Sequence, residues 1–183
     1  MRIEKKMLEG RQHLVVPVVM IRVGTWDGSG GPIYYPADVL ENSAQHWNGK
    51  PAVVYHPEMF GDGYAGHPEI FNRQKVGTVF NAHFDGDKLR AECWLDVERL
   101  QIVDSRVLVA LQKRRAVGVS TGLVGFDSGE KRDGATVLER ILPDHLAILP
   151  DQRGACSLAD GAGLLKNVRG YVDESPLELP CTI

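Results

Sequence analysis

Two alternating segments joined by an Asp-Gly pair are the feature that most limits what this chain can fold into. Apolar and polar residues alternate over residues 75–84 and again over residues 88–96. Asp85 and Gly86 lie between the two segments, and Asp-Gly suits the tight turn of a β-hairpin. We therefore predict two neighbouring antiparallel strands, so the fold must contain an antiparallel sheet.

Further short apolar segments indicate more strands around this hairpin. They cover residues 14–21, 52–55, 117–124, 136–142 and 145–149. Two helices are predicted, one from Pro36 to Trp47 and a longer one from Val97 to Arg115, where apolar residues recur at helical spacing. Residues 24–31 and 58–74 are predicted to be loops, and residues 127–134 a polar turn.

This order of elements favours a mainly β fold with peripheral helices, of the α+β class. No strand–helix–strand rhythm and no glycine-rich phosphate loop is present, which argues against a parallel nucleotide-binding sheet. We predict a mostly antiparallel barrel or sandwich. A chain of 183 residues can form one domain with a real core. We place this domain at residues 1–160 and predict a loosely ordered C-terminal tail over residues 161–183.

The charge balance indicates neither a nucleic-acid nor a membrane partner. Lys and Arg number 21 and Asp and Glu number 24, which gives a net charge of −3. The longest apolar runs are too short to cross a bilayer. The three cysteines, Cys93, Cys156 and Cys181, are scattered, which predicts free thiols in a reducing compartment.

The strand around Ser120 holds the first candidate for chemistry. Because side chains alternate between the two faces of a strand, Ser120 shares its face with Gly118 and Gly122. The missing side chains leave space beside the hydroxyl for a substrate backbone and an imidazole base. The alternative interpretation is a glycine-weakened strand against which another element packs.

Two histidines at strand ends are candidates for the base and for its partner. His56 follows the apolar segment 52–55, where its side chain could face a cleft, although an ordinary loop histidine before Pro57 would show the same pattern. Asp144 and His145 precede the apolar run 146–149. One of them could orient His56, because a serine nucleophile needs a base whose tautomer is fixed. Both could equally satisfy nearby backbone groups.

The turn after this run contains Arg153 and Gly154. Backbone N–H groups beside a glycine, together with an arginine, could stabilise a developing oxyanion.

Metal-dependent hydrolysis is the competing chemistry. His56 and His67 begin two similar His-Pro-Glu segments, and Glu58 or Glu69 could complete a metal site with them. The spacing matches no compact zinc pattern and no Cys-x-x-Cys is present. We therefore predict neither a metal nor another cofactor.

The order and separation of these segments resemble those of the prohead proteases of tailed phages, which share a fold with the herpesvirus maturation protease, assemblin. The similarity runs from about residue 14 to residue 160. The segments that carry it are PAVVYHP at 51–57, VGTV at 76–79 with DGDKL at 85–89, GVSTG at 118–122 and PDHLAIL at 143–149.

The resemblance implies a serine protease with an assemblin-like fold, in which Ser120 is the nucleophile and His56 the base. The third member of the family's site is an acid in many phage proteins and a histidine in the herpesvirus branch. His145 corresponds best to that member, with Asp144 as the alternative. Arg153 and Gly154 occupy the place similar to the family's oxyanion turn.

The resemblance also implies a role in capsid maturation. The expected substrates are scaffold and major capsid proteins, and the chain itself through autocleavage, inside the procapsid in the cytoplasm of a bacterial host. A homodimer or higher oligomer is a further expected partner, whereas no nucleic acid and no membrane is expected. The alternative to a protease is a catalytically inactive scaffold or assembly domain of the same fold.

Overall fold

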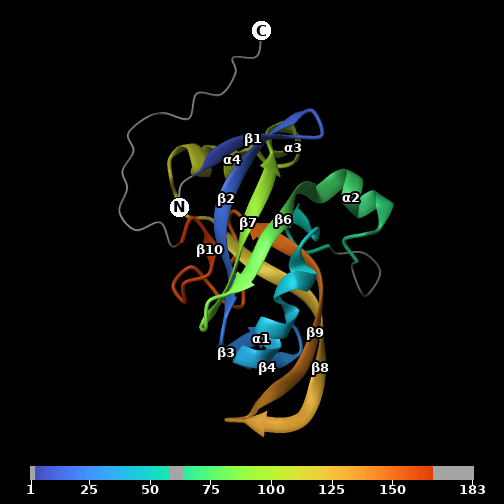
Figure 1. Ribbon diagram of the computed structural model, residues 1–183, viewed down its shortest axis with the longest axis vertical. Helices are drawn as coiled ribbons and strands as arrows, with labels where there is room; N and C mark the ends of the chain where they lie inside the picture. The colour runs from blue at the N-terminus through green and yellow to red at the C-terminus, as the bar shows by residue number, and fades with distance from the viewer. Residues whose placement is uncertain (1–2, 58–63, 167–183) are drawn as a thin grey trace.

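The computed structural model describes residues 3–57 and 64–166, which form a mixed α+β fold (Figure 1). Ten strands make one mostly antiparallel sheet in the order β1-β2-β7-β6-β5-β9-β4-β3, with β8 paired to β9 and β10 paired to β2. Four peripheral helices, α1 to α4, and a short 3-10 helix, η1, accompany the sheet. The bounds are β1 (Glu4–Leu8), β2 (Arg11–Arg22), β3 (Gly24–Gly28), β4 (Gly31–Tyr35), α1 (Ala37–Ser43), η1 (Ala44–Trp47), β5 (Pro51–Val54), α2 (Pro68–Gln74), β6 (Lys75–Phe84), β7 (Lys88–Asp96), α3 (Val97–Val103), α4 (Ser105–Gln112), β8 (Gly118–Arg132), β9 (Ala135–Leu149) and β10 (Gly163–Leu164).

The predicted β6–β7 hairpin is confirmed. The two strands pair antiparallel between Gly77 and Phe84 of β6 and Leu89 and Leu95 of β7. The Asp85 side chain holds the turn, because its Oδ1 accepts hydrogen bonds from the backbone N–H groups of residues 87 and 88, at 3.2 and 2.7 Å. Gly86 follows with φ +94°, a conformation that glycine adopts without strain.

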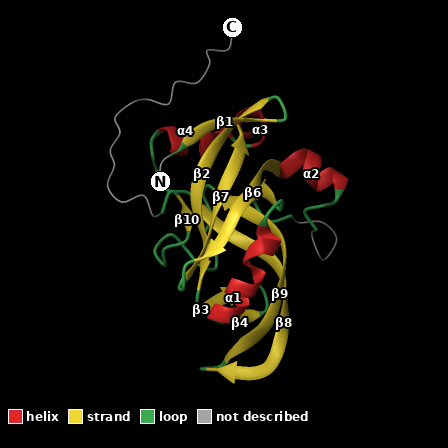
Figure 2. Cartoon of the chain, viewed as in Figure 1, coloured by secondary structure: helices red, strands yellow, loops and turns green. Residues whose placement is uncertain are grey.

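Strand β9 organises the part of the sheet that matters for the candidate site. It pairs antiparallel with β8 over almost its whole length. It also pairs in parallel with β5 at residues 146–148 and with β4 at residues 136–137. As a result, the C-terminal end of β5 lies beside the stretch of β9 that faces the start of β8. Figure 2 shows β8 and β9 running together as one long curved pair past β4.

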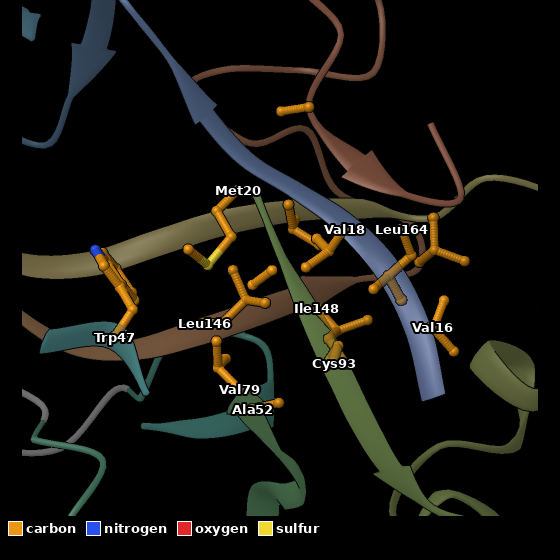
Figure 3. Close-up of a cluster of buried hydrophobic side chains, with 14 of the residues drawn as sticks. Val16, Val18, Met20, Trp47, Ala52, Val79, Cys93, Leu146, Ile148 and Leu164 are labelled. Carbon is orange, nitrogen blue, oxygen red and sulfur yellow. The ribbon is translucent and has the colours of Figure 1, made fainter. Parts of the chain in front are cut away.

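The apolar core gathers side chains from strands that are not neighbours in the sheet (Figure 3). Val18 and Met20 of β2 meet Leu146 and Ile148 of β9 in a single buried cluster, and Trp47 of η1 joins them. These side chains are at most 3% exposed. Successive side chains of a strand point to opposite sides, so the other face of β9 carries His145 together with Ala147 and Leu149, which are buried in a second, smaller apolar cluster.

The predicted barrel is wrong, because the sheet is open. β1 and β3 end the order of strands, and they do not pair with each other. The two-residue strand β10 reaches the start of β8 only through an isolated bridge between Val117 and Leu164. A barrel needs continuous hydrogen-bonded ladders all the way around, and one bridge does not provide them.

The single helix predicted over residues 97–115 is two helices, α3 and α4. The break falls at Asp104, whose φ of −160° is extended rather than helical. Its side chain accepts a hydrogen bond from the backbone N–H of Arg106 at 3.0 Å and thereby caps α4. The apolar spacing continues through the break, so periodicity alone predicts one helix.

Other predicted boundaries also differ from the structure. Residues 24–31, predicted as a loop, belong to the β3–β4 hairpin, and the loop predicted at 58–74 contains α2. The strands predicted at 136–142 and 145–149 are one strand, β9, and β8 continues through most of the predicted turn at 127–134. Pro143 fits inside β9 because it pairs with Leu123 at an irregularity, where a missing N–H is tolerated.

The packed part of the chain extends past residue 160, where we placed the domain boundary. Residues 163–164 form β10, and the Leu164 side chain is fully buried in the core. The rest of the predicted tail, residues 167–183, lies outside the described residues. Cys93 and Cys156 are free and buried, whereas Cys181 lies outside the described residues. Over the described ranges, no helix has the length and apolar character needed to cross a membrane.

Candidate active site

The pairing of β8 with β9 places Ser120 and His145 on the same face of the sheet. Ser120 is opposite Ala147 and Gly122 is opposite His145 in the antiparallel register. Residues two apart along a strand share a face and lie roughly 7 Å apart. Val119, the neighbour of Ser120, points the other way and is buried in the core. Ser120 therefore lies on the face opposite this core, where it is half-buried. It is two residues along β8 from Gly122, which pairs with His145.

Gly122 provides the space that the His145 imidazole occupies. A Cβ atom added at Gly122 would overlap three atoms of the His145 ring. The ring thus lies directly against the glycine backbone, and no larger residue fits without moving it. His145 is 4% exposed. The space that the missing side chain of Gly122 leaves on the face of Ser120 is filled by this histidine.

The turn after β9 passes along the other side of Ser120. A Cβ atom at Gly118 would lie 3.2 Å from the carbonyl oxygen of Leu149, so this glycine packs against the start of the turn. A Cβ atom at Gly154 would overlap the carbonyl oxygen of Val119 and lie 3.4 Å from the Cβ of Ser120. The Gly154 backbone is therefore next to Ser120, as an oxyanion site requires.

Arg153, the second residue predicted for the oxyanion site, extends its side chain into solvent. Its side chain is 78% exposed, and its Nη2 lies 3.9 Å from the carboxylate of Asp160. Of the two predicted residues, Gly154 is the one whose backbone the structure places beside Ser120.

A chain of hydrogen bonds links His56, His145 and Asp144. Nδ1 of His56 lies 2.8 Å from Nε2 of His145, and the two rings meet edge to face with centroids 5.0 Å apart. Nδ1 of His145 lies 2.7 Å from Oδ2 of Asp144. The same Oδ2 also accepts the backbone N–H of Ala65 at 3.0 Å. The two residues considered as alternatives for the third position therefore lie in series.

This chain fixes where the protons reside when Asp144 is ionised and both imidazoles are neutral. A carboxylate can only accept, so Nδ1 of His145 carries its proton and donates to Asp144. Nε2 of His145 then accepts from Nδ1–H of His56. The remaining nitrogen of His56, Nε2, is left unprotonated. This is the state in which an imidazole can act as a general base.

His56 is exposed to solvent, although its ring contacts His145. Partial loss of hydration at the ring, together with the repulsion that a charged His145 would exert, lowers the pKa of His56 from 6.5 to about 4. His56 is therefore neutral at neutral pH.

One contact that the chemistry needs is not formed in this structure. The Ser120 hydroxyl makes no hydrogen bond to His56 or to any other described residue. Register and ring contacts bring the two residues to the same face, next to the same histidine. In unliganded enzymes the bond between nucleophile and base is often long and tightens only with substrate.

The histidines of the competing metal hypothesis do not converge. His67 begins α2, where its Nδ1 accepts the backbone N–H of Glu69 at 3.3 Å. His56 instead bonds His145. Glu58 lies outside the described residues. Among the residues that the structure describes, no group of three or more His, Cys, Asp or Glu side chains is arranged to hold a metal ion.

The sequence did not point to two groups that support this site. One is the backbone N–H of Ala65, which binds Asp144. The other is a cluster formed by Tyr55, Arg106 and Asp151, in which Tyr55 adjoins His56 in the chain. No motif marks either group, because both depend on contacts between distant segments.

Comparison of the chain with models of protein families, with curated proteins and with solved structures found no match.

Proposed function

We propose that this protein is a serine endopeptidase in which Ser120 is the nucleophile and His56 the base. The observation that carries the proposal is the hydrogen-bonded series Asp144–His145–His56 beside a glycine-flanked serine. A serine hydroxyl is a weak nucleophile until an oriented base removes its proton. Here the series leaves an unprotonated imidazole nitrogen on the face of the sheet that holds the hydroxyl.

The reaction would proceed through an acyl-enzyme. Nε2 of His56 takes the hydroxyl proton as Ser120 Oγ attacks the peptide carbonyl, and the resulting imidazolium donates that proton to the departing amine. A water then loses its proton to His56 and attacks the ester, which releases the acid and returns the proton to Ser120. Backbone N–H groups beside Gly154 would stabilise the oxyanion in both steps.

His145 and Asp144 assist without touching the substrate. When His56 is protonated, its Nδ1–H donates to Nε2 of His145, and Nδ1–H of His145 donates to Asp144. The negative charge of Asp144 thus stabilises the positive charge of His56 through His145. Because His145 is buried, these interactions act in a less polar medium than water and gain strength there. In this arrangement His145 and Asp144 are consecutive members of one series rather than alternatives.

The substrate class rests on the resemblance to the phage prohead proteases and to assemblin. The sheet pairs β8, which bears Ser120, with β9, which bears His145. We therefore propose scaffold and major capsid proteins as substrates, with self-cleavage, inside a procapsid in the bacterial cytoplasm. A homodimer or higher oligomer forms part of the same proposal.

A specific observation favours a second candidate. The missing hydrogen bond between Ser120 and His56 would also be expected in a catalytically inactive assembly domain of this fold. Such a domain would contribute to scaffolding or procapsid packing and would not react with reagents for activated serines.

The decisive experiment labels the protein with a fluorophosphonate and locates the label by intact-mass and peptide analysis. The wild-type chain is compared with Ser120→Ala and with Ser105→Ala, which removes an exposed serine at the start of α4. We expect one label, on Ser120, in the wild type and in Ser105→Ala, and none in Ser120→Ala. Self-cleavage products, followed by mass in the same samples, should disappear in Ser120→Ala alone.

Two results would count against the proposal. Equal labelling or self-cleavage in the Ser120→Ala variant would remove Ser120 as the nucleophile. A folded wild-type protein that takes up no label, tested both dilute and at concentrations that promote oligomers, would favour the assembly domain.

A further inference from the structure

A polar cluster lies next to the candidate active site and joins three elements. The Tyr55 hydroxyl donates to Oδ1 of Asp151 at 2.7 Å and accepts from Nη2 of Arg106 at 2.7 Å. Nη1 of Arg106 donates to Oδ2 of Asp151 at 2.6 Å. Each of the three side chains therefore contacts the other two. Arg106 is also bound by Asp104, whose carboxylate caps α4.

The cluster connects the two chain segments that flank the proposed nucleophile. Tyr55 follows β5 and directly precedes His56, the proposed base. Asp151 follows β9 and begins the turn that leads to Gly154 beside Ser120. Arg106, from α4, spans the two segments. A shift of either segment would therefore be transmitted to the other through the Tyr55–Asp151 bond.

The backbone at Tyr55 shows why this matters for His56. Tyr55 has a φ of +62°, in the left-handed region that a bulky aromatic residue seldom adopts. Such a conformation persists only where surrounding contacts impose it. Its backbone N–H bonds the carbonyl oxygen of Ile148 at 3.1 Å, and its hydroxyl is held by the cluster. The turn that directs the next residue toward His145 is thus held at both ends of the tyrosine.

We propose that Tyr55, Arg106 and Asp151 form a clamp that positions His56 and the Gly154 turn relative to Ser120. The three are positioning residues, since no side chain of the three hydrogen-bonds Ser120 or His56. This inference rests on the proposed serine protease function for its kinetic readout. Its structural content, the orientation of His56, can be measured whether or not the protein is a protease.

The charges of the clamp determine how it responds to salt. The hydrogen bonds from Tyr55 and Arg106 lower the pKa of Asp151, and those from Arg106 lower the pKa of Asp104. Both carboxylates therefore stay ionised through neutral pH. The hydrogen bonds that link Arg106 with Tyr55 and Asp151 are exposed to solvent. Exposed ion pairs weaken as salt shortens the Debye length from about 10 Å at 0.1 M to about 3 Å at 1 M.

The test compares Tyr55→Phe, Asp151→Asn and Arg106→Gln with Arg90→Gln, which breaks an ion pair with Asp85 at the β6–β7 hairpin. Three quantities are measured for each variant. They are the rate of fluorophosphonate labelling at Ser120 in low and high salt, the His56 pKa from an NMR titration, and the thermal unfolding midpoint. Tyr55→Phe removes one oxygen atom only, so it keeps the fold even if Arg106→Gln does not.

We expect each clamp variant to slow labelling about tenfold, which corresponds to a loss of ~1.4 kcal/mol in transition-state stabilisation. The Tyr55→Phe and Asp151→Asn losses should add only in part in the double variant, because Asp151→Asn weakens the same hydrogen bond that Tyr55→Phe removes. High salt should slow the wild type and Tyr55→Phe, but not Arg106→Gln or Asp151→Asn, which lack the Arg106–Asp151 ion pair. Arg90→Gln should label at the wild-type rate.

The NMR titration separates this inference from the proposed function. A His56 ring released from His145 loses the causes that lower its pKa, so its pKa should rise toward 6.5 in the clamp variants. If the wild type takes up no label, the protease proposal fails and the titration alone decides on the clamp. An unchanged His56 pKa in a folded Tyr55→Phe variant, or labelling within twofold of the wild type, would overturn the clamp.

Discussion

The two halves of the β8–β9 hairpin are built from the same pair of strands yet differ in almost every respect. In the near half, residues 118–122 pair with residues 145–149 without interruption. Leu146, Ala147 and Ile148 are fully buried there, and β5 pairs with the other edge of β9. In the far half, Val124 and Leu142 are opposite each other and are 57% and 45% exposed.

The register explains why the candidate site lies in only one of these halves. Three irregularities interrupt the ladder, and the first falls between Gly122 and Leu123, immediately beyond the His145 pair. The first two irregularities each leave one residue of β9 unpaired, which changes the face that its following side chains share with β8. Residues 118–122 and 145–149 keep a single register, so Ser120 and His145 share a face in the near half. Beyond Gly122 this register is lost.

The largest effect should come from Gly122→Ala, which tests whether the near half depends on a bare backbone. The added Cβ would overlap the His145 ring, so the ring must leave its place or the strands must separate. We expect labelling of Ser120 to fall at least about a hundredfold, with a loss of about 1–3 kcal/mol in unfolding free energy. Gly125→Ala, in the far half, meets the flexible end of Leu138 and should cost less. Equal effects of the two substitutions would contradict the comparison.

The next effect concerns the carboxylate that ends the hydrogen-bonded series. Asp144→Asn keeps the shape of the side chain but removes the charge, and its NH₂ group can reverse the tautomer of His145. We expect labelling to slow by about 10²-fold while the thermal midpoint changes little. Asp127→Asn is the matched control in the far half, where the carboxylate accepts only the local N–H of Gly129 among described groups. A wild-type labelling rate in Asp144→Asn would show that the series ends at His145.

The pH dependence of stability should report on the near half, where His145 contacts His56. The pKa of His56 is lower in the folded protein than its ordinary value of 6.5, so the unfolded chain binds more protons between pH 6.5 and about 4. The free energy of unfolding should therefore fall as the pH decreases through that window. His56→Ala should reduce the slope, whereas His83→Ala, at an exposed position of β6, should not. Urea unfolding at a series of pH values measures both, and identical slopes would refute the lowered pKa.

The smallest effect is expected in the far half itself. Val124→Thr changes an exposed side chain on a strand and leaves a residue that also favours β structure. We expect less than about 0.5 kcal/mol change in unfolding free energy and an unchanged labelling rate. A loss of labelling in this variant would mean that the far half takes part in the site.

Local sequence signals predicted the parts of the fold that local physics controls. The Asp85–Gly86 turn, the strand at residues 14–21 and the short helix after Pro36 all appear in the structure. The face shared by Gly118, Ser120 and Gly122 also follows from alternation alone, and the register agrees with it. In these cases the decisive interactions lie within one or two neighbouring elements.

The remaining features depend on contacts that no local pattern encodes. The open edge of the sheet follows from how briefly β10 meets the start of β8. The break at Asp104 depends on one capping bond, which leaves the apolar spacing unchanged. For the site, the sequence named His56, Asp144 and His145 as candidates. Their order, with His145 between His56 and Asp144, depends on side-chain geometry. The Tyr55 clamp joins three distant segments and was missed for the same reason.

The place of β9 in the sheet has a consequence for how the protein is made. His56 and His145 are 89 positions apart, and the pairing of β5 with β9 is parallel and long-range. Long-range pairing of this kind forms late in folding, because closing a long loop comes before any gain from the contacts. A growing chain would carry Ser120 and His56 well before β9 leaves the ribosome. Synthesis order therefore delays closure of the Asp144–His145–His56 series until β9 is available to pair.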